Sequence, residues 1–132
     1  MIDCLILGDS IGRGIADVRP DCTAYVQSGI NSRDWNKKYL DRDLNAPLVV
    51  ISLGSNDLAV IRTEEELERL RSHIAPSNRV LWVLPAIKPR IQEIVFRVAD
   101  RWRDDVIELA EVSRDGVHPT GNGYRALGKL IK

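Results

Sequence analysis

The fold follows from one stretch of sequence, Leu48-Val49-Val50-Ile51-Ser52-Leu53-Gly54-Ser55-Asn56-Asp57. Its first four residues are apolar, three of them are β-branched, and Gly54 follows closely. A short apolar run without polar alternation is typical of a strand buried on both faces, as in a parallel sheet covered by helices. The polar residues after such a strand lie in a loop at its carboxyl end, which is where open α/β sheets bind their ligands.

Four further apolar runs are similar to this one. They occupy residues 4–7, 23–26, 80–84 and 106–109. Between the runs, apolar residues recur at the spacing of a helix. The clearest stripes are Leu67, Leu70 and Ile74; Ile91, Ile94, Val95, Val98 and Trp102; and Tyr124, Leu127 and Ile131. Five strands that alternate with helices predict a three-layer α/β sandwich around a five-stranded parallel sheet.

The starts of the helices carry signals of their own. Thr63 and Glu66 have the spacing of a capping box, which predicts a helix with Thr63 as its N-cap. A shorter helix is expected after Ser32, and the last helix is expected to start near residues 119–120.

Composition limits the class of protein. The chain has 132 residues, a common size for one domain, so residues 1–132 are expected to form a single domain. Nineteen Lys and Arg balance nineteen Asp and Glu, and this zero net charge argues against a nucleic-acid binder or a polybasic membrane module. No apolar run approaches the roughly 20 residues that span a bilayer, and the start of the chain lacks a basic signal segment. A protein that is cytoplasmic as synthesised is therefore expected.

Cys4 and Cys22 have no CxxC motif or accompanying histidine that would indicate zinc. In a chain without an export signal, two buried, reduced thiols are the expectation. No set of Asp, Glu or His residues has metal-ligand spacing, and no glycine-rich phosphate cradle is present, so neither a metal nor a cofactor is predicted.

Polar residues gather in four loops that follow strands or precede the last helix. They are Gly8-Asp9-Ser10-Ile11-Gly12, Gln27-Ser28-Gly29-Ile30-Asn31, Gly54-Ser55-Asn56-Asp57 and Asp115-Gly116-Val117-His118-Pro119. Ser10 stands at a strand-to-helix turn, where its hydroxyl can project from the sheet edge as a nucleophile. His118 can serve as its base, because imidazole changes charge close to neutral pH. Asp115 is three positions away, close enough to accept a hydrogen bond from that imidazole.

Ester hydrolysis also needs donors for the oxygen that becomes negative in the tetrahedral intermediate. Suitable donors are the N–H of Ser10 at a helix start, the N–H of Gly29 and the side-chain amide of Asn56. Structural interpretations stay open: Ser10 as a helix N-cap, Asn56 and Asp57 as turn residues and His118 as a capping or surface histidine. Asp9 is interpreted as a carboxylate that stabilises its turn.

The four segments resemble the conserved blocks of the SGNH hydrolases, also called GDSL esterases or lipases. The resemblance rests on Gly8-Asp9-Ser10, Gly29, Gly54-Ser55-Asn56-Asp57 and Asp115-Gly116-Val117-His118-Pro119, in the family's order. It runs from residue 3 to the last helix, with Ile11 in place of the family's leucine and only Ser28 and Gly29 matching the second block. It implies a flavodoxin-like α/β/α sandwich that hydrolyses esters, often acetyl esters on carbohydrates.

The resemblance also implies a role for each of these residues. Ser10 would be the nucleophile, His118 the base and Asp115 the residue that orients it. The N–H groups of Ser10 and Gly29 and the amide of Asn56 would form the oxyanion hole.

The short loops leave no segment for a lid or an acyl tunnel, so a small acyl group, above all acetyl, is predicted on a small-molecule or carbohydrate ester. Arg13 and Trp35 are candidate substrate contacts, although an exposed arginine and a packed tryptophan are the alternatives. Two other functions stay open: a catalytically weak carbohydrate-binding or structural module with this fold, and a flavodoxin-like phosphate or nucleotide binder. The sequence does not indicate an oligomeric state.

Overall fold

The computed structural model describes residues 2–132, in which five strands alternate with five helices. The strands are β1 (Cys4–Gly8), β2 (Thr23–Val26), β3 (Leu48–Ser52), β4 (Arg79–Leu84) and β5 (Asp105–Glu108). The helices are α1 (Ser10–Val18), α2 (Ser32–Tyr39), α3 (Thr63–Ser72), α4 (Pro89–Trp102) and α5 (Gly121–Leu130). The five predicted strands are confirmed, with ends that differ by at most one residue.

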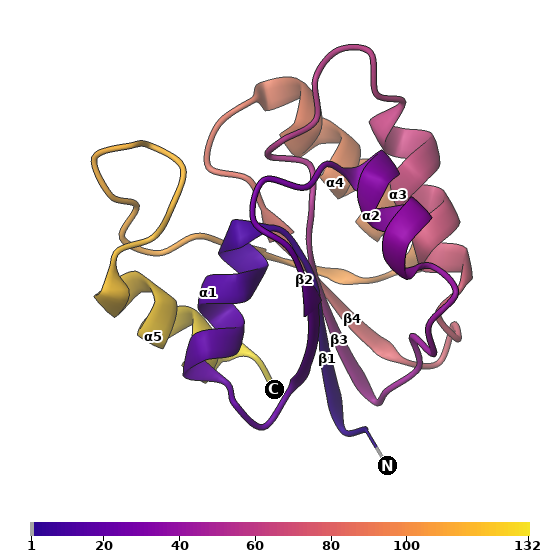
Figure 1. Ribbon diagram of the computed structural model, residues 1–132, viewed down its shortest axis with the longest axis horizontal. Coiled ribbons are helices and arrows are strands. Elements are labelled where there is room, and N and C mark those ends of the chain that lie inside the picture. The colour runs from indigo at the N-terminus through magenta and orange to yellow at the C-terminus, as the bar shows by residue number, and fades with distance from the viewer. Residues whose placement is uncertain (1) are drawn as a thin grey trace.

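All strands pair in parallel, in the order β2-β1-β3-β4-β5. Helices α1 and α5 cover one face of the sheet, and α2, α3 and α4 cover the other (Figure 1). The predicted three-layer sandwich is therefore confirmed. Because the strands are parallel, the loops that follow β2, β1 and β3 start at neighbouring positions on one edge of the sheet.

Each face of the sheet buries its own apolar cluster. Successive residues of a strand point to opposite faces, so Leu5 and Leu7 pack with the cluster under α2, α3 and α4, whereas Ile6 packs with the cluster under α1 and α5. In β3, Val49 and Val50 divide between the two clusters in the same way. Both strands are buried along their whole length, which explains why their sequences show no polar alternation.

Asp9, and not Ser10, is the N-cap of α1. Its Oδ1 accepts the N–H of Ile11 at 3.0 Å and that of Gly12 at 3.5 Å, so the interpretation of Asp9 as a turn-stabilising carboxylate is confirmed. Ser10 is the first residue of the helix, and its hydroxyl is therefore free of the capping role.

The capping box predicted at the start of α3 is wrong. Arg62 holds the N-cap position and makes no side-chain cap bond. The hydroxyl of Thr63 instead donates to Asp57 Oδ2 at 2.7 Å, because Thr63 is the first residue of the helix and the buried carboxylate of the preceding loop lies beside it.

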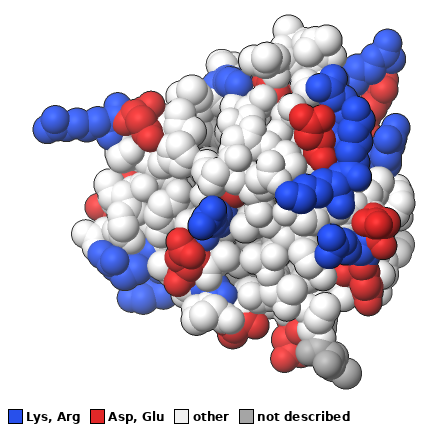
Figure 2. Space-filling view, viewed as in Figure 1, with Lys and Arg blue, Asp and Glu red and all other residues white. Residues whose placement is uncertain are grey.

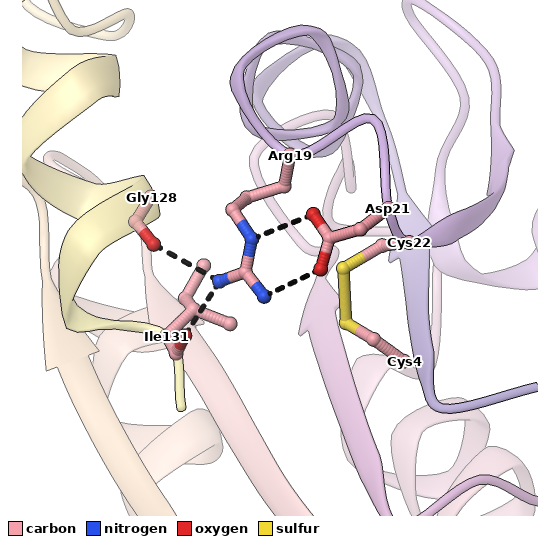
Figure 3. Close-up of a disulfide and its surroundings, with 6 residues drawn as sticks. All are labelled: Cys4, Arg19, Asp21, Cys22, Gly128 and Ile131. Atoms are coloured by element: carbon pink, nitrogen blue, oxygen red, sulfur yellow. Dashed lines mark hydrogen bonds and ion pairs between the residues drawn. A yellow bond between two sulfur atoms is a disulfide. The ribbon is translucent and has the colours of Figure 1, made fainter.

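Cys4 and Cys22 form a disulfide, so the expectation of two reduced thiols is wrong (Figure 3). Cys4 opens β1 and Cys22 directly precedes β2. Because these strands are neighbours in the sheet, the two Cα atoms lie only 4.7 Å apart although 18 positions separate them in the sequence.

Arg19 lies beside the disulfide and connects the α1–β2 loop to α5 (Figure 3). Its guanidinium pairs with Asp21 at 2.9 Å. It also donates to the carbonyl oxygens of Gly128, at 3.0 Å, and Ile131, at 2.5 Å. These carbonyls belong to the last turn of α5 and to its C-cap residue, where the helix offers no N–H partner.

Charged side chains of opposite sign lie next to one another on the face shown in Figure 2, in keeping with the zero net charge. Between two helices, Arg97 and Arg101 of α4 pair with Glu64 of α3 at 2.7 and 3.0 Å. Within residues 2–132, no helix is both long enough and apolar enough to cross a membrane.

Candidate active site

Ser10, His118 and Asp115 form a continuous chain of hydrogen bonds, although they come from opposite ends of the sequence. Ser10 Oγ lies 2.7 Å from His118 Nε2, and His118 Nδ1 lies 2.7 Å from Asp115 Oδ2. Because the Nδ1–H donates to the carboxylate, Nε2 is left to accept the hydroxyl proton of Ser10. The arrangement suits transfer of that proton to the imidazole as the serine oxygen attacks a carbonyl.

A tight junction between β1 and α1 presents Ser10. Gly8 ends β1 so close to β3 that a Cβ at this position would collide with the carbonyl oxygen of Ser52. The same carbonyl accepts the N–H of Asp9 at 3.0 Å. The chain therefore leaves the sheet at once, and Ser10 begins the helix at the sheet edge.

Asp9 is buried beneath this junction and is only 1% exposed. Besides the two helix N–H groups, Oδ1 accepts the hydroxyl of Ser52 at 3.3 Å, and Oδ2 has no hydrogen-bond partner among residues 2–132. Burial raises the pKa of Asp9 to about 6, although the bonds from Ile11, Gly12 and Ser52 act in the opposite direction. The carboxylate also occupies N–H groups that a phosphate would need at a helix start, which counts against the nucleotide-binding alternative.

The loop before α5 holds His118 through Asp115. Asp115 Oδ1 accepts the N–H of Val117 at 2.8 Å, that of His118 at 2.9 Å and the hydroxyl of Ser113 at 2.9 Å. These bonds, chiefly that from the His118 N–H and then that from Val117, hold the pKa of Asp115 well below its usual range. Asp115 therefore remains a carboxylate at neutral pH and orients both the backbone and the ring of His118.

A hollow of about 250 Å³ borders the same loop at the carboxyl ends of β4 and β5. Its lining residues are Leu84, Pro85, Ala86, Gln92, Glu108, Leu109 and Val112. Val112 forms an antiparallel β-bridge with Pro119, the residue after His118. One side of the hollow is therefore bonded to the segment that carries the candidate base.

The three predicted oxyanion donors come from the loops after β2, β1 and β3, which are adjacent in the sheet. For the part of the chain that the structure describes, neither the N–H of Ser10 nor that of Gly29 has a hydrogen-bond acceptor. Gly29 is exposed and has a φ of 79°, a left-handed conformation that favours glycine. The amide of Asn56 donates to the carbonyl of Ile30 at 3.1 Å, which ties its loop to that of Gly29, and the NH₂ group carries a second N–H.

Asp57 and Lys88 hold these loops together, although the sequence suggested no more than a turn residue for Asp57 and nothing for Lys88. Asp57 is buried and accepts the N–H of Ser32 at 2.8 Å, the hydroxyl of Ser32 at 2.5 Å and the hydroxyl of Thr63 at 2.7 Å. Lys88 Nζ donates to the carbonyl oxygens of Ser55 at 2.7 Å and Asp57 at 3.3 Å. The position of Asp57 in the third polar loop could have drawn attention to it, whereas nothing in the sequence marks Lys88.

The two candidate substrate contacts lie in different surroundings. Arg13 is exposed on α1, one turn beyond Ser10, and its contact with substrate stays a prediction. The prediction for Trp35 is wrong, because its side chain lies on the inner face of α2 and is fully buried. The indole N–H donates to the carbonyl of Tyr25 at 2.9 Å, and the ring packs against Tyr39.

The sequence matches no protein-family model and no curated protein. Its fold nevertheless matches solved structures over nearly the whole chain, including the following three. One is a protein assigned as an acylhydrolase from Bacteroides fragilis, 18% identical, with a TM-score of 0.67 over 97% of this chain and 83% of that one. Another is a member of the lipolytic protein G-D-S-L family from Veillonella parvula, 16% identical, with a TM-score of 0.69 over 98% and 95%.

The third structure is the C-terminal catalytic domain of the peptidoglycan O-acetyltransferase A from Streptococcus pneumoniae, determined with a methylsulfonyl adduct. It is 13% identical, with a TM-score of 0.59 over 98% of this chain and 87% of that one. The fold implied by the resemblance in sequence is therefore confirmed: these residues adopt the α/β/α sandwich of the SGNH hydrolases.

Proposed function

We propose that this chain, which has the fold of the SGNH hydrolases, is a serine esterase that needs no cofactor and cleaves short-chain esters, above all acetyl esters. The observation that carries the proposal is the chain of two 2.7 Å contacts from Ser10 Oγ through the imidazole of His118 to the carboxylate of Asp115. A structural serine or a capping histidine would not require this three-residue alignment.

In the first half of the reaction, Ser10 Oγ attacks the carbonyl carbon of the ester while His118 Nε2 takes the hydroxyl proton. The bond between the carbonyl carbon and the alcohol oxygen then breaks, and the imidazolium returns the proton to that oxygen. The products are a free alcohol and an acyl group attached to Ser10. Asp115 remains ionised and stabilises the imidazolium that forms between these two transfers.

In the second half, water attacks the acyl carbon as His118 Nε2 removes one of its protons. The bond to Ser10 Oγ breaks, the imidazolium protonates the serine oxygen, and the carboxylic acid leaves. The enzyme is thereby restored to its starting state.

Both tetrahedral intermediates carry a negative oxygen. The N–H of Ser10, the N–H of Gly29 and the second N–H of Asn56 are the donors proposed for it, and the start of α1 adds the positive end of a helix dipole. Each such donor contributes on the order of 3 kcal/mol to stabilisation of the transition state.

A small, neutral ester, free or carried on a carbohydrate, fits the open site best. The net charge is zero, which offers no general attraction for nucleic acid or an anionic membrane. The side chain of His118 is 39% exposed, so an ester can reach Ser10 from solvent without an opening step.

The test is hydrolysis of p-nitrophenyl acetate and of a panel of acetylated saccharides by the wild type and by Ser10→Ala. The wild type is expected to turn over the aryl ester, and Ser10→Ala is expected to lose this turnover while its thermal unfolding is unchanged. Equal activity of the two proteins would overturn the mechanism.

The alternative is a catalytically weak carbohydrate-binding or structural module that retains the fold. A fluorophosphonate probe separates the two, since only a serine activated by a base reacts with it. Labelling that requires both Ser10 and His118 supports the esterase. A protein that binds saccharides but resists the probe would be the module instead.

A further inference from the structure

Lys88 directly precedes α4, and its side chain extends to the loop that carries Asn56. Its ammonium group donates to the carbonyl oxygens of Ser55, at 2.7 Å, and Asp57, at 3.3 Å. These carbonyls belong to the residues on either side of Asn56. One cation therefore holds the loop both at the residue before and at the residue after the candidate oxyanion donor.

The other end of Lys88 is held by α4. Its carbonyl oxygen accepts the N–H groups of Ile91, at 2.9 Å, and Gln92, at 3.1 Å. The backbone has a φ of 68° and a ψ of 79°, in the left-handed region that residues with a side chain rarely adopt. Such a conformation persists only where the surroundings enforce it, and here the helix and the Asn56 loop hold the residue from both ends.

The Asn56 loop is held from its opposite side by Asp57 and by Asn56 itself. Asp57 binds Ser32 and Thr63 through its carboxylate, and the Asn56 amide binds the carbonyl of Ile30. These contacts connect the loop to α2, to α3 and to the loop of Gly29. None of these hydrogen bonds reaches α4, where Gly54 packs against Ile91 and Lys88 supplies the hydrogen bonds.

We propose that Lys88 is a positioning residue of the oxyanion hole, which acts by holding the loop at the residues before and after Asn56. The inference rests on the proposed esterase activity. A hydrogen bond from a charged donor is shorter and stronger than one from a neutral group, and here it restrains a loop that has no regular secondary structure. Oxyanion stabilisation depends on donors that are already in place when charge develops.

The test compares Lys88→Met, which keeps the length of the side chain but removes its charge, with Lys88→Arg, which keeps the charge. With p-nitrophenyl acetate, Lys88→Met is expected to lower kcat about 10-fold and to change KM by less than about 2-fold, because the oxyanion forms only after substrate binds. Lys88→Arg is expected to recover most of the lost kcat. Lys37→Met, at an exposed lysine of α2, is the matched control and should behave as the wild type.

A double-mutant cycle with Asn56→Ala tests whether Lys88 acts through Asn56. If it does, Lys88→Met changes kcat by less than about 2-fold once the amide is gone. Equal losses of kcat in both backgrounds would overturn the proposal, as would wild-type kcat in Lys88→Met. If Lys88→Met unfolds at the assay temperature, Lys88→Gln replaces it in the same cycle.

The wild type and Ser10→Ala are assayed beside these variants. Activity that depends on Ser10 but not on Lys88 refutes the positioning role and leaves the esterase intact. Absence of Ser10-dependent activity refutes the esterase, and the role of Lys88 falls with it.

Discussion

Asp57 binds Ser32 twice, through the N–H at 2.8 Å and through the hydroxyl at 2.5 Å, although the two residues are 25 positions apart. Ser32 opens α2 and lies three residues after Gly29, whereas Asp57 directly follows Asn56. The buried carboxylate therefore fixes the loop of Gly29 against the loop of Asn56, and with it the distance between these two candidate oxyanion donors.

Asp57→Asn is expected to lower kcat roughly 10- to 100-fold with little change in KM. Asp57 Oδ2 accepts hydrogen bonds from both the Ser32 hydroxyl and the Thr63 hydroxyl. The amide nitrogen of an asparagine in this position is itself a donor, so it could accept neither bond. Steady-state kinetics on an aryl acetate measures the effect. Asp100→Asn, at an exposed carboxylate of α4, is the control, and equal kinetics for the two variants would show that Asp57 does not organise the site.

Asp115→Asn is expected to lower kcat by roughly 10²- to 10⁴-fold. An amide can offer its NH₂ group to the imidazole in place of an acceptor, and the ring would then present the wrong nitrogen to Ser10. Because the pKa of Asp115 lies well below its usual range, titration of this carboxyl should not lower wild-type kcat even at about pH 4, where an ordinary aspartate is half protonated. An unchanged kcat in Asp115→Asn would remove Asp115 from the mechanism.

The fold and the central residues of the site could be predicted because both follow from local patterns. Unalternating apolar runs identify strands that are buried on both faces, and parallel strands bring the loops of Ser10 and Asn56 to one edge of the sheet. Asp115 and His118 are three positions apart, so their contact depends only on the local turn. The fold could therefore be predicted without knowing any specific contact between distant residues.

The contacts that the sequence did not reveal follow no repeating pattern, and most of them join residues far apart in the chain. Cys4 and Cys22 meet because β1 and β2 pair, and their spacing alone does not contain that information. Lys88 reaches Ser55 across 33 positions through a left-handed backbone that no motif predicts. Thr63 has the sequence of an N-cap, yet the buried carboxylate of Asp57 takes its hydroxyl.

Asp9→Asn is expected to change how stability depends on pH. Burial raises the pKa of Asp9 from 3.8 to about 6 in the folded protein, so between these values the folded state holds a proton that the unfolded state has released. Stability from this group is therefore present at low pH and is lost as pH rises to about 6. Relative to Asp9→Asn, the wild type should lose up to about 3 kcal/mol of unfolding free energy between about pH 4 and pH 7.

Urea unfolding of both proteins across that pH range measures this difference. Asp100→Asn, at an exposed carboxylate, serves as the control for a general effect of charge. A difference between the wild type and Asp9→Asn that stays constant with pH would show that Asp9 does not titrate in this window.

Reduction of the Cys4–Cys22 disulfide is expected to lower the unfolding free energy by about 3 kcal/mol, since it releases a loop of 18 residues in the unfolded chain. Arg19 lies within that loop and binds the end of α5, so the α1–β2 loop and α5 should lose hydrogen-exchange protection together. Thermal unfolding with and without a phosphine reductant measures the effect. In Cys22→Ser the reductant should have no effect, and a wild type that ignores the reductant would contradict the prediction.

Acetyl esters are expected to be better substrates than long-chain esters. The longest connections near the site, residues 53–62 and 109–120, carry Asn56 and His118 themselves, so neither is free to serve as a lid over an acyl chain. The ratio of kcat/KM for p-nitrophenyl acetate over the decanoate should be about 10 or more. A higher value for the decanoate would contradict the prediction. The exposed Leu58 and Val60 would then be the candidates for binding the acyl chain, and Leu58→Ser would be expected to lower activity on the decanoate alone.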